Sequence, residues 1–104
     1  MTNQEINAAC AEAMGWERHQ IGGWDGWLCG DKPMAEARWN PAKFIADAWV
    51  LLEKLREYDC DVAVESCGAA WCVEHLSNRC CCATAPMVIC LAFLEWAKAA
   101  KETL

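Results

Sequence analysis

The chain has few basic residues, and this shortage argues against one class of function. It carries 9 Lys and Arg residues against 15 Asp and Glu residues, so its formal net charge is −6. Non-specific binding to DNA or RNA needs clustered basic side chains that neutralise phosphates. We therefore expect no nucleic-acid polymer among its partners. A small anionic ligand needs only a few local Arg, Lys and backbone N–H groups, so that class stays open.

The sequence also lacks a signal-peptide pattern and a long apolar run. Its first residues are polar and acidic, and its longest apolar stretch, residues 87–94, is far shorter than a membrane span. Nine cysteines would suggest a disulfide scaffold in a secreted protein, but their odd number and the missing export signal favour reduced thiols. We expect a cytoplasmic protein with no membrane contact, formed by a single α+β domain over residues 1–104.

Start and stop signals predict three helices. Thr2 and Glu5 form a capping box for the first helix, and Gly15 is its stop. The pair Asn40-Pro41 predicts the start of the second helix, since Asn caps well and Pro fits the first helical position. Thr84 is the expected cap of the third. The second and third helices are expected to end near Tyr58 and Lys101.

The segments between these helices predict short strands. Glycines punctuate residues 16–39, where we expect strands at Trp16–Gln20 and Trp24–Cys29 joined by a Gly-Gly turn, then an irregular loop to Trp39. Alternating patterns predict further strands at residues 61–66 and 71–76, with a short one at 80–83. The order α-ββ-α-ββ(β)-α favours an α+β fold, in which three helices cover one antiparallel sheet of four or five strands.

Several of these signals together resemble the phage ABA sandwich domain family. The segment Thr2–Trp16 resembles the opening helix of that family and its Gly-Trp stop. Trp39-Asn40-Pro41 resembles the start of its next helix. Thr84-Ala85-Pro86, with Ile89-Cys90, resembles its closing helix. The resemblance implies a small phage or prophage accessory protein that acts in the host cytosol, and it brings no catalytic residues to transfer.

The glycine- and tryptophan-rich segment, residues 22–30, departs from the family pattern and is the candidate binding surface. We expect Trp24 and Trp27 to be displayed there, because large rings in a glycine-rich loop are hard to bury fully. Indole faces stack on nucleobases and Arg can fork onto a phosphate, so Arg38 and Trp39 complete the predicted ligand site. The other four tryptophans are expected to be core residues: Trp16, Trp49, Trp71 and Trp96.

Cysteine and histidine offer two alternatives, a metal site and a catalytic thiol. The candidate zinc ligands are Cys67, Cys72, His75, Cys80 and Cys82. Positions 72 and 75 point to opposite faces of a regular strand, and no paired C-x-x-C frame is present, so buried thiols are the simpler interpretation. A cysteine beside His19 or His75 could form a catalytic dyad, but no nucleophile elbow or oxyanion loop marks one.

The sequence therefore predicts a non-catalytic phage accessory protein. The leading hypothesis is a host-defence antagonist that sequesters a small ligand, plausibly a nucleotide signal, or blocks a host protein. The alternatives are a zinc-stabilised interaction module and a thiol-dependent enzyme, and no cofactor is expected apart from the zinc of the first alternative. A homo-oligomer fits a small apolar domain, which gains by burying surface between copies.

Overall fold

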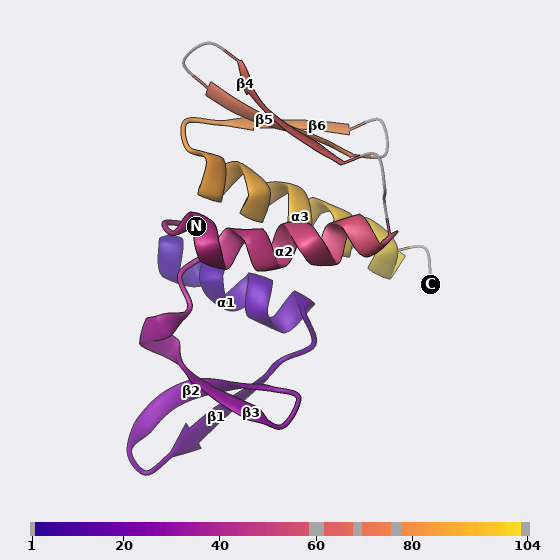
Figure 1. Ribbon diagram of the computed structural model, residues 1–104. Helices are drawn as coiled ribbons and strands as arrows, with labels where there is room; N and C mark the ends of the chain where they lie inside the picture. The colour runs from indigo at the N-terminus through magenta and orange to yellow at the C-terminus, as the bar shows by residue number, and fades with distance from the viewer. Residues whose placement is uncertain (1, 59–61, 68–69, 76–77, 103–104) are drawn as a thin grey trace.

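Three helices lie between two small antiparallel sheets in the computed structural model of the chain (Figure 1). The structure describes residues 2–58, 62–67, 70–75 and 78–102. Within these ranges, the structure describes only the backbone of Ile21, Trp24, Tyr58, Cys67, His75, Asn78, Arg79, Lys101 and Glu102.

The elements follow one another in the order helix, sheet, helix, sheet, helix. The helices are α1 (Asn3–Ala13), α2 (Ile45–Tyr58) and α3 (Ala85–Glu102). The first sheet contains β1 (Glu17–Ile21), β2 (Trp24–Cys29) and β3 (Lys32–Ala35), followed by the short 3-10 helix η1 (Glu36–Arg38). The second sheet contains β4 (Ala63–Cys67), β5 (Ala70–His75) and β6 (Asn78–Cys82).

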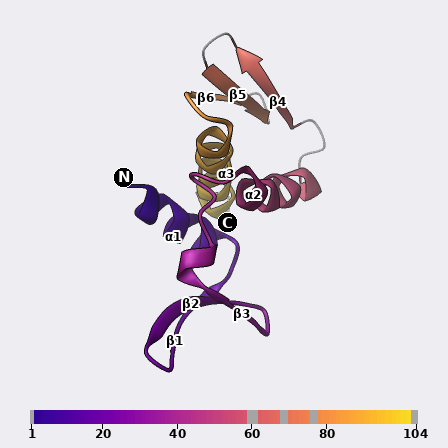
Figure 2. The same cartoon turned by 60° about the vertical axis from the view of Figure 1, so that its left-hand side comes forward.

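The two sheets lie on opposite sides of the helices. Figure 1 places β4–β6 above the helices and β1–β3 below them, and the turned view of Figure 2 keeps this order. The predicted α+β class is confirmed, and the strands of both sheets pair antiparallel. Each sheet has three strands, fewer than the four or five expected of one sheet, because the helices separate the two groups. The prediction of one domain stays a prediction.

The local signals around α1 act as the sequence predicts. The Glu5 N–H donates to the Thr2 hydroxyl over 3.2 Å, and the Glu5 carboxylate accepts from the Thr2 N–H, so the capping box is present. Gly15 adopts a φ of 83°, and its N–H and that of Trp16 satisfy carbonyls of the last helical turn. This cap turns the chain out of α1 and into β1.

Two glycine turns build the first sheet. Gly22 and Gly23 have φ values of 59° and 88°, which is the two-residue hairpin turn that this pair predicts between β1 and β2. Gly30, with a φ of 68°, turns the chain again into β3, which pairs with β2. The prediction of an irregular loop here was wrong. β3 contains Pro33, and it is an edge strand, where the missing N–H of proline is tolerated.

The second helix begins later than predicted. The pair Asn40-Pro41 opens a separate turn, because the Asn40 carbonyl accepts from the Phe44 N–H over 2.9 Å and α2 starts only at Ile45. The Asn40 N–H donates to the Asp47 carboxylate over 2.9 Å, which ties this turn to the first turn of α2. The capping signal therefore marks the turn before the helix and not the helix start.

The third helix is central to the fold. The Met87 N–H donates to the Thr84 hydroxyl over 3.4 Å, so the predicted cap is present. α3 packs against α1 and α2, and it also contacts β5 and β6. The largest fully buried side chains include Phe93, Ile89 and Val88 from α3, Leu51 and Leu55 from α2, and Val73 from β5. Within the described ranges, no helix is long and apolar enough to cross a membrane.

The second sheet rests mainly on α3. Its observed strands agree with the predicted ones to within about two residues. Residues 68–69 and 76–77, between these strands, fall outside the described residues. Val73 packs into the core with Val64 and Cys80, its partners in the sheet. Because side chains alternate along a strand, Cys72 and Cys81 lie on the opposite face, away from the helices.

Candidate functional site

A cleft of about 470 Å³ lies between the first turns of α1 and the chain around η1. This volume is within the roughly 300–1,000 Å³ that small-molecule pockets occupy. Its described lining is rich in side-chain amides and consists of Asn3, Gln4, Asn7, Ala8, Trp27, Glu36, Ala37, Trp39 and Asn40. The cleft therefore contains two of the four predicted ligand residues, Trp27 and Trp39.

Asn7 holds the two sides of the cleft together. Its side-chain Nδ2 donates to Asn40 Oδ1 over 2.9 Å, and its Oδ1 accepts from the Ala42 N–H over 3.0 Å. Its backbone carbonyl accepts from the Trp39 indole N–H over 2.9 Å. One residue of α1 thus satisfies three polar groups of the segment before α2. These bonds are part-buried, which raises the cost of losing a partner.

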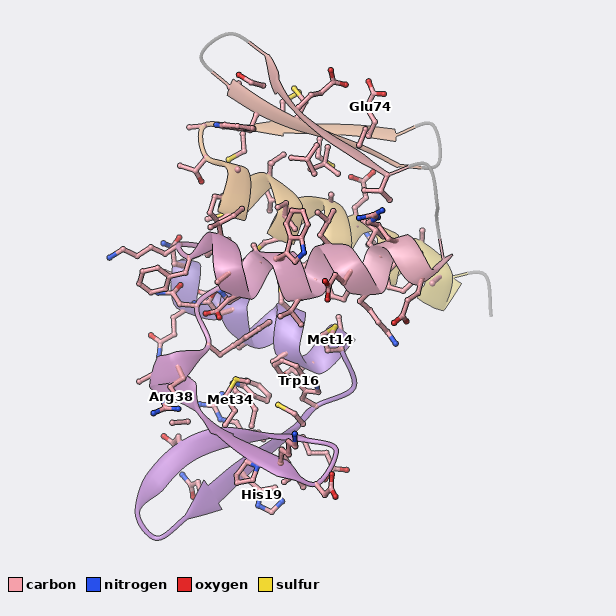
Figure 3. The ribbon with its side chains drawn as sticks, in the orientation of Figure 1. Met14, Trp16, His19, Met34, Arg38 and Glu74 are labelled. Carbon is pink, nitrogen blue, oxygen red and sulfur yellow. The ribbon has the colours of Figure 1, made fainter. Side chains whose placement is uncertain are left out.

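Trp27 forms part of the cleft floor. Its position in β2 points the ring toward α1, on the same sheet face as its partner Met34. Figure 3 shows Trp16 and Met34 directed into this same space between α1 and the first sheet. Trp27 is only 2% exposed, so the expectation that it is displayed at the surface was wrong. A regular strand, and not an open loop, carries the residue, and α1 covers it.

Trp39 lies beside Trp27 in the lining and is also buried, with 3% exposure. Its ring meets that of Trp16 edge to face, with the centroids 4.6 Å apart and an interplanar angle of 65°. The Trp39 indole N–H is already bonded to Asn7. The two lining indoles are therefore buried at the base of the cleft and offer no open face for stacking.

Charge at the cleft comes from an ion pair across the first sheet. Arg18 of β1 bonds Glu36 of η1 over 3.2 Å, and its guanidinium lies 5.5 Å from the centroid of the Trp27 ring. Both side chains of the pair are partly solvated, so the pair adds little to stability. Glu36 lines the cleft, and it is the one carboxylate among the described lining residues.

The other two predicted ligand residues are placed differently. Arg38 is exposed in η1, next to the lining residues Ala37 and Trp39, but is not itself among the described lining residues. Trp24 begins β2, and its side chain lies outside the described part of the structure.

Sequence reasoning missed the amides that make the cleft polar. Asn7 was treated as an ordinary residue of α1, and Asn40 only as a helix cap. The two are 33 positions apart, so no local pattern could have paired them. The available signal was an asparagine directly after Ile6 on the buried face of α1, where an amide is expected to need partners.

A second concave surface lies between α2 and the second sheet. This apolar groove, about 610 Å³ in volume, is lined by Ile45, Trp49, Leu52, Arg56, Val62, Val64, Trp71, Ala85, Pro86 and Ile89. Trp49 is 47% exposed and Trp71 is 39% exposed, so the expectation that both are core residues was wrong. The reason is that the sheet rests mainly on α3, which leaves α2 and β4 separated by the groove.

The candidate zinc ligands are not brought together as one set. Cys80 and Cys82 pack toward the helices, whereas Cys72 faces the other side of the sheet. The side chains of Cys67 and His75 lie outside the described residues. Among the residues that the structure describes, no group of three or more His, Cys, Asp and Glu side chains is arranged to hold a metal ion. The zinc alternative stays a prediction.

Cys10 of α1 and Cys80 of β6 are poor nucleophiles. The hydrogen bond to Cys90, followed by burial, raises the pKa of Cys10 far above its ordinary value. Burial and a 2.9 Å hydrogen bond to Glu95 raise the pKa of Cys80 to about 12. A raised pKa keeps a thiol protonated at neutral pH, and only the thiolate attacks. Of the two candidate bases, His19 is exposed on the face of the first sheet turned away from α1 (Figure 3), and the side chain of His75 lies outside the described residues.

Comparison with known proteins gives one match. No curated protein and no solved structure matches the chain. The family model of the phage ABA sandwich domain matches residues 11–94, which is more than half of the chain and runs from α1 into α3. The match spans both sheets, the cleft residues from Trp27 to Asn40 and the groove between α2 and the second sheet, so the chain belongs to the phage ABA sandwich domain family.

Proposed function

We propose that the protein acts by binding and not by turnover, as a phage antagonist of host defence that sequesters a small ligand carrying a nucleobase. The observation that carries this proposal is the amide-lined cleft at α1 and η1. The phage setting comes from the family. Binding is favoured over catalysis because the described lining contains neither histidine nor cysteine, and Glu36, its carboxylate, is already paired with Arg18.

The chemistry of the cleft suits the edge of a planar base. Gln4 and Asn3 present amides that both donate and accept hydrogen bonds, as a base edge requires. Glu36 can accept from an exocyclic amino group. The buried rings of Trp27 and Trp39 supply the apolar floor that is typical of such pockets.

A phosphate would lie outside the cleft and not within it. The described lining includes a carboxylate and no basic side chain, so its interior does not favour an anion. Arg38 is exposed next to the lining residues Ala37 and Trp39, so it is available to a phosphate at the margin. Arg38 thus keeps its predicted role as a phosphate ligand, whereas Trp27 and Trp39 form the floor of the cleft and do not stack on the base.

The test is a thermal-shift screen against linear and cyclic nucleotides, followed by mass spectrometry of the released ligand. A nucleotide that raises the Tm and is recovered intact supports sequestration, since a ligand bound only to the folded state stabilises it. Gln4→Ala should weaken the shift, whereas Gln20→Ala, at the other glutamine of the chain, should not. Nucleotide consumed during incubation would support the enzyme alternative, and no shift from any nucleotide would contradict the proposal.

A second candidate function is supported by the apolar groove. Exposed aromatic side chains are enriched at protein interfaces, and Trp49 and Trp71 flank one continuous groove with Ile45. Through this groove the protein would block a host protein without binding a small molecule. The double variant Trp49→Ser and Trp71→Ser should abolish a purified complex while leaving nucleotide binding intact. If the same variant converts a dimer into a monomer, the groove serves self-association instead.

A further inference from the structure

Two cysteines face each other across the second sheet. Cys72 of β5 and Cys81 of β6 are direct partners in the antiparallel register, and their sulfur atoms lie 2.8 Å apart. Directly opposed residues in such a ladder have Cα atoms about 4.5–5.5 Å apart, within the range of about 4.4–6.8 Å found in disulfides. The sulfurs need to approach by less than about 1 Å to reach the bond length of roughly 2.05 Å.

The two thiols differ in their access to solvent. Cys72 is 1% exposed, whereas Cys81 is exposed at the surface of the sheet. On the same face, Glu74 is exposed and points away from the helices (Figure 3). A reagent therefore reaches Cys81 first, and Cys72 lies beside it as the second thiol.

The neighbouring cysteines are separated from this pair by the sheet itself. Cys80 and Cys82 are the residues on either side of Cys81, and strand alternation directs them toward the helices. Cys80 donates to the Glu95 carboxylate, which holds it protonated. Three consecutive cysteines thus carry different chemistry, because only the middle one faces the Cys72 thiol.

We propose that Cys72 and Cys81 form a reversible dithiol–disulfide site that reacts with low-molecular-weight disulfides. The Cys81 thiolate attacks one sulfur of the small disulfide, whose S–S bond breaks and releases one thiol that takes up a proton. The Cys72 thiolate then attacks the Cys81 sulfur, the mixed disulfide breaks, and a second small thiol leaves with the proton that Cys72 gives up. Two electrons pass from the two cysteines to the small disulfide, and a bond joins β5 to β6.

The test uses the full reduced chain with mixtures of oxidised and reduced glutathione. After acid quenching and alkylation, tandem mass spectrometry of peptides cut after Glu65, Glu74 and Arg79 locates any new bond. Fragment ions are needed because each of the two peptides carries more than one cysteine. We expect a link between Cys72 and Cys81 that carries no glutathione and is reversed by excess reduced glutathione. A bond that joins other cysteines instead, or a glutathione that persists on Cys81 while Cys72 is still alkylated, would overturn the proposal.

Two variants and one control separate the two steps. Cys72→Ser should stop at the first step and accumulate one glutathione on Cys81. Cys81→Ser should form neither the adduct nor the cross-strand bond. Cys80→Ser, which removes a thiol from the other face, should still close the Cys72–Cys81 bond. Loss of the bond in this control would overturn the proposal, and the wild-type peptide map decides the question even if a variant folds poorly.

Discussion

The two three-stranded sheets use tryptophan in opposite ways. In the first sheet, Trp27 is almost completely buried beneath α1, against Trp39 and Met34. In the second sheet, Trp71 stands beside an open groove with Trp49 of α2, and both rings are substantially exposed. The sheets are alike in size and pairing, so the difference comes from what covers them.

A tryptophan ring is buried where a helix packs over the sheet face that carries it. The local density of glycine does not decide its exposure. α1 and η1 close over the first sheet, and Asn7 fastens α1 to the segment that follows η1. The second sheet rests mainly on α3, and α2 leaves a groove beside it. A ring on a covered sheet face stabilises the fold, whereas a ring beside an open groove is placed to contact another molecule.

The largest expected loss of stability follows removal of the buried ring of Trp27. Trp27→Ala should lower the free energy of unfolding by about 3–5 kcal/mol, because it leaves a cavity under α1. Trp49→Ala removes the same side chain from an exposed position and should cost no more than about 1 kcal/mol. Urea unfolding of the two variants measures the contrast. Equal losses would contradict the difference in cover between the two sheets.

The next effect concerns the bonds that hold α1 to the segment after η1. Asn7→Ala leaves the buried Ala42 N–H without its acceptor and should lower the free energy of unfolding by about 1–3 kcal/mol. Asn3→Ala changes an exposed asparagine about one helical turn away on the cleft wall and serves as the control. Urea unfolding of both variants tests this. If the two lose the same stability, Asn7 does not fasten the cleft.

Local sequence signals predicted the local structure well. The capping box at Thr2, the glycine turn at Gly22 and Gly23, and the cap at Thr84 each involve residues no more than three positions apart, and each is present. Such contacts form wherever the chain permits, so a single sequence is enough to predict them. The third strand of the first sheet was not predicted. It can form despite Pro33 because an edge strand tolerates a proline.

The candidate site is formed by contacts between residues far apart in the sequence, which no local pattern can predict. Trp27 and Trp39 were identified as site residues, and they do line one cleft, but their burial depends on α1, which precedes them by many residues. Asn7 bonds Asn40 across 33 positions and was not identified. Trp49 and Trp71 follow an apolar pattern typical of core residues, yet the packing of the sheet on α3 leaves them exposed.

A smaller effect concerns the polar contact between the second sheet and α3. Burial and the Glu95 carboxylate raise the pKa of Cys80 from 9.0 to about 12 in the folded protein, so folding favours the neutral thiol. The contribution of this contact to folding stability is complete below pH 9.0, the ordinary pKa of the thiol in the unfolded chain. It is lost as the pH rises through about 12, the pKa in the folded protein. The stability difference between the wild type and Cys80→Ala should therefore shrink over this window.

Chemical denaturation at several pH values measures this difference, and both proteins share the other cysteines, so the change belongs to Cys80. Glu95→Gln should lower the pKa of Cys80 only partly, because burial remains after the carboxylate is removed. A stability difference that stays constant from pH 8 to the alkaline limit of folding would show that this contact does not hold the sheet to the helix.

The smallest effect on stability is expected at the groove, where the contrast between the sheets is most directly visible in fluorescence. Trp49→Phe with Trp71→Phe should change the free energy of unfolding by only about 0.5–1 kcal/mol, because both rings are already partly in water. The same double variant should lose much of the acrylamide-quenchable emission of the protein. Trp27→Phe should do the reverse, costing stability while leaving the quenchable emission unchanged. If Trp27→Phe instead removes quenchable emission, solvent reaches the ring beneath α1, and the first sheet is as open as the second.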